Sequence, residues 1–176
     1  MLTHRELCVT TVRYLLENPI YGLAGWELRY NRGFADALAV TIKDRASNPR
    51  ITVVEVKRTR ADMLADLKAR KMLKYEKGST HCYLACTPEC LRLDRQPIAQ
   101  AIEELTELGL PTKWGILIIR GDQVTSIRNA YSIGPFNKTR ARALIKKLGR
   151  SAMFRSLGME NPNDDRESLS DLEEEC

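Results

Sequence analysis

The sequence predicts a single domain of the α/β class, and three observations support this prediction. Strand-like, largely apolar runs occur at residues 34–43 and 51–57, segments with helical period flank them, and capping residues mark where several of those segments begin. A chain of 176 residues is long enough for one well-packed domain with a tail, but short for two domains. We therefore expect a domain over residues 1–155 and a tail over residues 156–176.

The first expected element is a helix over residues 3–17. Thr3 and Glu6 have the spacing of a capping box, and Asn18-Pro19 should end the helix. Its apolar residues recur with helical period: Leu7, Val9, Val12, Leu15 and Leu16. A strand should follow over residues 20–30.

The next two strands form a hairpin across the polar turn at residues 44–49, and they carry charge where a strand is normally apolar. Strand side chains alternate between faces, so Glu55 and Lys57 point the same way, and Asp36 lies on the neighbouring strand. Such groups are costly to bury unless they are paired. Two carboxylates and a lysine can form a site for a hard cation such as Mg²⁺, although Glu55 and Lys57 can also be a surface ion pair.

The remaining elements follow from caps, period and turn residues. Thr59 and Asp62 have capping spacing, and Gly78 is a suitable helix end. On the helix between them, Asp66 and Arg70 should pair in solvent at spacing i,i+4. Together these signals predict a helix over 59–77, a strand over 81–88, a helix over 96–109, a hairpin of strands 114–119 and 123–128, and a helix over 137–150.

The cysteines are expected to be reduced and buried. Five is an odd number, which does not favour a disulfide framework. His81, Cys82, Cys86 and Cys90 together suggest zinc. However, zinc sites favour paired ligands on a knuckle, and these residues lie on and just after a regular strand, so we favour small buried thiols.

Charge is distributed unevenly along the chain. The net charge is +5, but residues 160–176 hold eight acidic side chains and one arginine, so the remaining 159 residues carry +12, the difference between +5 and −7. A body this basic is typical of proteins that bind a phosphate backbone. The acidic tail should be disordered; it could compete with DNA for that body or contact a protein partner.

The chain has no apolar run near the length that spans a membrane and no signal-peptide pattern at its start. We therefore expect a cytoplasmic protein without a membrane partner, in a bacterial or phage-infected cell.

The hairpin sequence resembles a known family. Phe34-Ala-Asp-Ala-Leu-Ala-Val and Val54-Glu-Val-Lys resemble the PD-(D/E)xK nuclease superfamily, with Asp36 at the motif Asp and Glu55-Val56-Lys57 at E-x-K. With Cys82-Tyr-Leu-Ala-Cys-Thr-Pro and Trp114-Gly-Ile-Leu-Ile, the chain is similar to MmcB-like DNA-repair proteins and their phage relatives over roughly residues 20–130. Ala35 departs from the motif, which has proline there.

This resemblance implies a restriction-endonuclease-like αβββαβ core with a mixed central sheet flanked by helices, followed by an extra C-terminal hairpin and helix. It implies a Mg²⁺-dependent DNA endonuclease or repair nuclease, with Mn²⁺ as an alternative ion, in which Asp36, Glu55 and Lys57 are catalytic. Asp36, Glu55 and the Val56 carbonyl would hold the metal. Glu6 or Glu27 would be a further ligand, but Glu6 can simply cap its helix and Glu27 can be a surface residue.

DNA contacts are expected on two helices, unless these are solvated basic faces. The candidate residues are Lys68, Lys71, Arg140, Arg142, Lys146 and Lys147. Two other readings stay open: a catalytically inactive nucleic-acid-binding module, and a phage–host interaction protein that retains the nuclease fold. The substrate form, DNA against RNA, and a homodimer also stay open.

Overall fold

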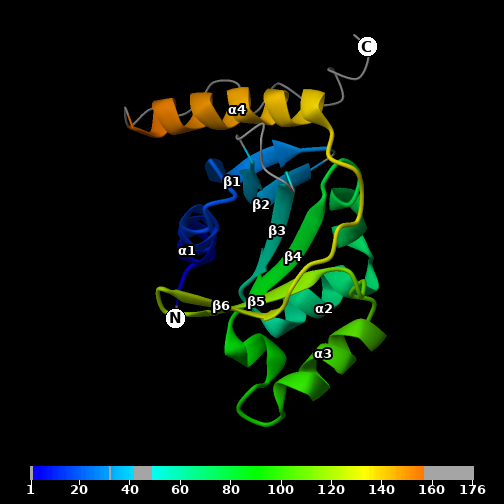
Figure 1. Cartoon of the computed structure of the whole chain (residues 1–176). Helices are drawn as coiled ribbons and strands as arrows, with labels where there is room; N and C mark the ends of the chain where they lie inside the picture. Colours follow the sequence, from blue (N-terminus) through cyan, green and yellow to red (C-terminus); the bar gives the residue numbers. More distant parts are fainter. Residues whose placement is uncertain (1, 32, 42–48, 157–176) are drawn as a thin grey trace.

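The computed structural model describes residues 2–31, 33–41 and 49–156, with side chains as far as Ser151. One six-stranded sheet runs in the order β1-β2-β3-β4-β5-β6, with helices on both faces (Figure 1). The elements are α1 His4–Glu17, β1 Leu23–Tyr30, β2 Gly33–Val40, β3 Ile51–Lys57, α2 Arg60–Lys68, η1 Lys71–Tyr75, β4 His81–Cys86, η2 Pro88–Leu91, α3 Ile98–Glu107, β5 Gly115–Arg120, β6 Gln123–Arg128 and α4 Lys138–Ser156.

The sheet is mixed. β1, β2 and β3 form an antiparallel meander, β3, β4 and β5 are parallel, and β6 returns antiparallel to β5. Each parallel connection carries a helix, α2 between β3 and β4 and α3 between β4 and β5, as parallel pairing requires a crossover. The α/β class, the αβββαβ order and the extra C-terminal hairpin and helix are thereby confirmed.

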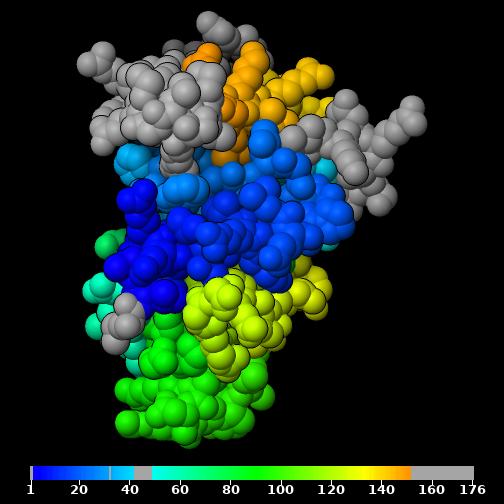
Figure 2. All heavy atoms as spheres, turned by 90° about the vertical axis from the view of Figure 1, so that its left-hand side faces the viewer, coloured from blue at the N-terminus to red at the C-terminus, as the bar shows by residue number. Residues whose placement is uncertain are grey.

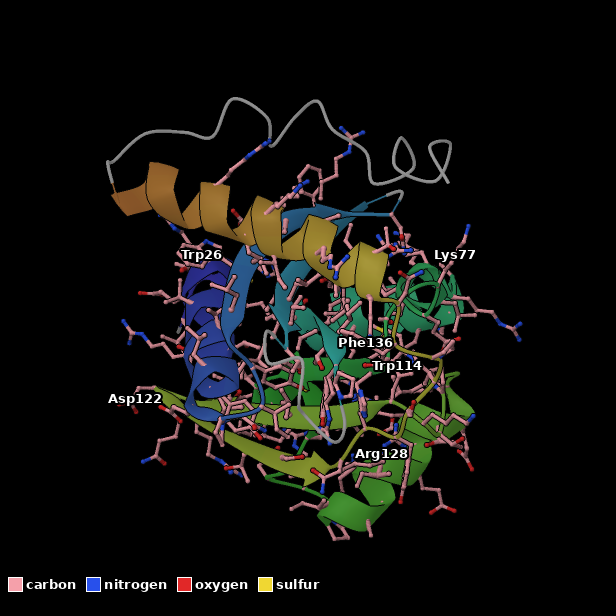
Figure 3. All side chains as sticks on the ribbon, turned by 45° about the horizontal axis from the view of Figure 1, so that its top comes forward. Trp26, Lys77, Trp114, Asp122, Arg128 and Phe136 are labelled. Carbon is pink, nitrogen blue, oxygen red and sulfur yellow. The ribbon has the colours of Figure 1, made fainter. Side chains whose placement is uncertain are left out.

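Each face of the sheet has its own apolar core. Val54 and Val56 pack with α1 on one face, while Ile51 and Val53 pack on the other face with the core that α2, α3 and α4 cover. Figure 2 shows α1 across the middle of its face, between α4 and the β5–β6 hairpin. In Figure 3, Trp26 of β1 lies beside α1, and Asp122 marks the tip of that hairpin.

The expected helix over residues 59–77 is wrong in its second half. α2 ends at Lys68, Arg70 adopts a left-handed conformation with φ 51°, and a separate 3₁₀ turn follows. The break directs Met72 and Tyr75 into the core, and the Tyr75 hydroxyl donates to the Phe34 carbonyl at 2.5 Å. Burial of two large side chains offsets the cost of one strained residue.

The last helix is longer than expected. Asn137 caps it, with its Oδ1 accepting the Arg140 amide at 2.9 Å, but Gly149 does not end it and α4 continues to Ser156. The expected turn at 44–49 falls mostly, and the acidic tail almost entirely, outside the described residues. No helix in the described ranges is long and apolar enough to cross a membrane.

Candidate active site

The site begins where β2 and β3 separate. Their backbone pairing runs from Val40–Ile51 to Ala37–Val54 and stops there. Beyond it, Oδ2 of Asp36 accepts a hydrogen bond from the Val56 amide at 2.7 Å, in the position a strand carbonyl would otherwise take. A carboxylate at this point satisfies the amide that the separating strands would leave unpaired.

β1 is deformed at the same level. Trp26 pairs with Ala37 and Leu28 with Ala35, so the register places Glu27 opposite Asp36. Glu27 adopts a left-handed conformation with φ 52° and its side chain is exposed. The local irregularity frees Asp36 from the regular alternation of β2, which allows its carboxylate to lie between the strands.

Glu55 and Lys57 lie on the neighbouring strand, together in a buried ion-pair network. Lys57 Nζ lies 2.9 Å from Glu55 Oε1 and 2.5 Å from Asp66 Oδ2, while the exposed Asp62 is 3.5 Å away. The Glu55 and Lys57 side chains are only 9% and 7% exposed. Pairing of this kind is what makes burial of an ammonium group tolerable.

Asp66 is a member of the site that sequence reasoning missed. The expected pairing with Arg70 in solvent is wrong, because Asp66 is buried and bonds to Lys57 and, at 3.1 Å, to Lys71. The signal was its position on α2: Met63, Asp66 and Leu67 form one buried stripe at spacing i, i+3, i+4.

The pKa values reflect this crowding of charge. Burial, and then the negative charge of Glu55, raise the pKa of Asp36 to about 6. Burial would lower the pKa of Lys57, but Glu55 and Asp66 outweigh it and raise the pKa above the ordinary value. Conversely, hydrogen bonds from Lys57 and Lys71 outweigh burial and keep the pKa of Asp66 below its ordinary value.

One carboxylate oxygen at this site lacks a hydrogen bond. Among the described residues, Glu55 Oε2 is buried without a hydrogen-bond partner. The Tyr75 hydroxyl donates to the Phe34 carbonyl at 2.5 Å, and it also lies close enough to Glu55 that, after burial, this carboxylate raises the pKa of the hydroxyl. Four carboxylates, at positions 36, 55, 62 and 66, meet two ammonium groups here, at 57 and 71. An unpaired carboxylate oxygen in an acidic, oxygen-rich setting fits a hard divalent cation.

The other predicted metal ligands lie as follows. Glu6 accepts from the backbone amide and the hydroxyl of Thr3, at 2.7 and 2.9 Å, and completes a capping box for α1. Its carboxylate is therefore engaged at its own helix end. Glu27 lies closer to the site, since its charge contributes to raising the pKa of the Cys8 thiol.

The predicted DNA-contacting side chains separate into two groups. Lys68, Arg142 and Lys146 are exposed. Arg140 stacks over the Tyr30 ring at 4.9 Å and donates to Asn31, Lys147 donates to the Arg29 carbonyl at 3.3 Å, and Lys71 pairs with Asp66. The second group serves the fold as well as the surface charge.

Two side chains of α1 were not singled out from the sequence. His4 Nε2 lies 3.4 Å from Asp36 Oδ1, and Cys8 Sγ lies 3.4 Å from the same His4 nitrogen. Residues four apart share one helix face, which is the only signal the sequence offered.

Asp36→Asn is expected to stabilise the metal-free protein at pH 7 by about 2–3 kcal/mol, because the amide can still accept the Val56 hydrogen bond without a buried charge. The folded-state pKa, about 6, lies above the ordinary value of 3.8. The ionised carboxyl therefore costs stability above about pH 6, and that cost is lost as the pH falls toward 4. As the pH is lowered across this range, urea unfolding should show the free energy of unfolding of wild type rising relative to that of the variant. Parallel stability curves for the two proteins would contradict the raised pKa.

Comparisons with known proteins bear on the fold only. No protein-family model and no curated protein sequence matches this chain. The solved structure of SPO1766, a protein of unknown function from Silicibacter pomeroyi, is similar at 24% identity and TM-score 0.61, over 88% of this chain and 89% of that one. SfsA of Pyrococcus furiosus, solved in complex with Ca²⁺, aligns at 13% identity and TM-score 0.28, over 70% of this chain and 60% of that one.

Proposed function

We propose that this protein is a Mg²⁺- or Mn²⁺-dependent nuclease that hydrolyses phosphodiester bonds in DNA. The observation that carries the proposal is a pair of carboxylates on adjacent strands, the half-buried Asp36 and the buried Glu55, of which Glu55 keeps an unpaired oxygen beside a buried lysine. This is the residue set that the resemblance to PD-(D/E)xK nucleases implies. A cation held there would supply Lewis-acid stabilisation of the phosphate charge and lower the pKa of an attacking water.

Each residue has a task in this proposal. Asp36 Oδ1 is the oxygen that the Val56 amide leaves open, Glu55 Oε2 is the oxygen that Lys57 leaves open, and the Val56 carbonyl is the further ligand that the resemblance implies. Lys57 pairs with Glu55 at 2.9 Å and supplies positive charge beside the scissile phosphate. Asp66 also accepts a hydrogen bond from the lysine ammonium, at 2.5 Å, and thereby orients it.

DNA as substrate is supported by the basic body and by the exposed cations of α4. Arg142 and Lys146 are four residues apart on one face of α4, which packs on β1 and β2. Each phosphate contact adds affinity that salt weakens.

Replacing Arg142 and Lys146 together by Glu is expected to weaken DNA binding at least tenfold at low salt. It should also reduce the slope of log affinity against log salt concentration by the equivalent of about two phosphate contacts. Fluorescence anisotropy over a salt series measures both. The matched control is Arg95→Glu with Lys113→Glu, two exposed cations in the segments flanking α3, which changes the net charge equally. Equal losses in the two variants would mean that α4 is not the contact.

A second candidate is a nucleic-acid-binding module without catalysis. It is favoured by the two ion pairs of Lys57, with Glu55 at 2.9 Å and with Asp66 at 2.5 Å, because they already engage the ammonium group that the reaction would use. A plasmid-nicking assay with Mg²⁺ and with Mn²⁺ distinguishes the two. Nicking that chelator abolishes supports the nuclease; DNA binding without nicking in either ion supports the module.

A further inference from the structure

On its α1 side Asp36 lies beside two side chains, His4 and Cys8, that the proposed nuclease reaction does not use. His4, Cys8 and Asp36 each offer one ligand atom, and the three atoms lie within 4.8 Å of one another. They supply nitrogen, sulfur and oxygen, a donor set unlike the all-oxygen set beside Glu55. We propose that these residues form a binding site for Zn²⁺ or a similar thiophilic divalent ion.

The two distances from His4 to the other ligand atoms match those of such an ion, and the third separation is at most 4.8 Å. Tetrahedral Zn²⁺, with bonds of about 2.0–2.3 Å, separates a nitrogen ligand from an oxygen ligand by about 3.4 Å and from a sulfur ligand by about 3.6 Å. Here His4 Nε2 lies 3.4 Å from Asp36 Oδ1 and 3.4 Å from Cys8 Sγ. Three protein ligands also leave the fourth tetrahedral position open.

Each ligand is fixed by neighbouring structure. The Val56 amide holds Oδ2 of Asp36, so Oδ1 is the oxygen directed at His4. The capping box of Thr3 and Glu6 fixes the first turn of α1, which sets His4 one turn before Cys8. Hydrogen bonds of this kind orient metal ligands in advance of binding.

The charges around Cys8 disfavour a free thiolate and attract a cation. Cys8 is fully buried, and burial followed by the charges of Asp36, Glu27 and Glu55 raises the pKa of its thiol. The same negative charges attract a divalent ion, and on binding the thiol releases one proton to solvent as the metal–sulfur bond forms. The His4 side chain is 43% exposed, so an ion can reach the cluster from solvent along α1.

This site does not depend on nuclease activity. It shares Asp36 with the hard-cation pair, but its soft ligands are on α1 and not on the α2 side of the sheet. Metal identity therefore distinguishes the two: Mg²⁺ has little affinity for a thiol, whereas Zn²⁺ and Co²⁺ bind thiolate and imidazole.

The test uses the full chain, reduced and stripped of metal, titrated with Co²⁺ and then with Zn²⁺. A thiolate-to-Co²⁺ charge-transfer band in the near ultraviolet is expected at one equivalent, and Zn²⁺ should remove it. Cys8→Ser should lose the band and bind Zn²⁺ at least tenfold more weakly in competition with a chromophoric chelator. His4→Ala, which leaves the buried thiol in place, should also weaken Zn²⁺ binding at least tenfold.

Cys90→Ser and Cys176→Ser are the matched thiol controls, and both should keep the band. Glu55→Gln should keep the band as well, since Glu55 adds charge near the site but supplies none of its three ligand atoms. A band that persists in Cys8→Ser, equal Zn²⁺ affinity in wild type and His4→Ala, or no band in wild type would each overturn the proposal. If Cys8→Ser does not fold, the His4→Ala titration decides.

Discussion

Glu55→Gln is expected to lower Mg²⁺-dependent DNA cleavage by roughly 100-fold to 10,000-fold, the equivalent of several kcal/mol of transition-state stabilisation. The substitution keeps the size of the side chain but removes the charge from the buried, unpaired oxygen Oε2. Lys57 retains Asp66 at 2.5 Å, so the fold should persist. Initial rates of plasmid nicking, with unfolding measured on the same preparations, test both statements.

Two control variants make this result specific. Glu103→Gln removes an exposed carboxylate on α3 and should leave nicking unchanged. Glu27→Gln tests the residue opposite Asp36 on β1: a tenfold or larger loss would place it in the metal site, and no loss would make it a surface residue. Undiminished cleavage by folded Glu55→Gln would remove Glu55 from the reaction.

Lys57→Met is expected to destabilise the protein by about 3–5 kcal/mol, because it leaves Glu55 and Asp66 buried without their cation. The variant therefore tests a structural role that precedes any catalytic one. Loss of cleavage by this variant is interpretable only beside its unfolding free energy, which urea denaturation provides. A loss below about 1 kcal/mol would mean that the two carboxylates find other partners.

A double variant separates charge from packing. Adding Asp66→Asn to Lys57→Met removes one uncompensated carboxylate and should recover part of the lost stability. In the single variant Asp66 loses the Lys57 contact that lowers its folded-state pKa, so that pKa must rise and the stability deficit should shrink as the pH falls toward the ordinary carboxyl range. A deficit that is constant with pH, and that Asp66→Asn does not reduce, would instead indicate lost packing of the lysine stem.

The sequence predicted the strands that carry the site better than the groups that complete it. Period-two alternation placed Glu55 and Lys57 on one face, and β3 spans the expected residues 51–57. The sequence did not show whether Asp66 is buried. An aspartate three residues after a buried methionine is compatible with an ion pair in solvent and equally with a buried ion pair. Only the lysine on β3, which approaches through space, decides between them.

Two further misses have similar physical causes. The break after α2 depends on where Met72 and Tyr75 find space in the core, and helical period alone continues through Arg70. His4 lies beside a carboxylate only because β2 separates from β3 and directs Asp36 toward α1. Contacts between segments far apart in the chain therefore determine what local patterns leave open.

The central claim is that Asp36 and Glu55 share one divalent cation, and anomalous diffraction from crystals grown with Mn²⁺ tests it most directly. A single strong Mn²⁺ peak within bonding distance of oxygens from both carboxylates is the predicted result. The contradicting result is a map without a peak between them in which the Lys57 ammonium alone occupies the space beside Glu55.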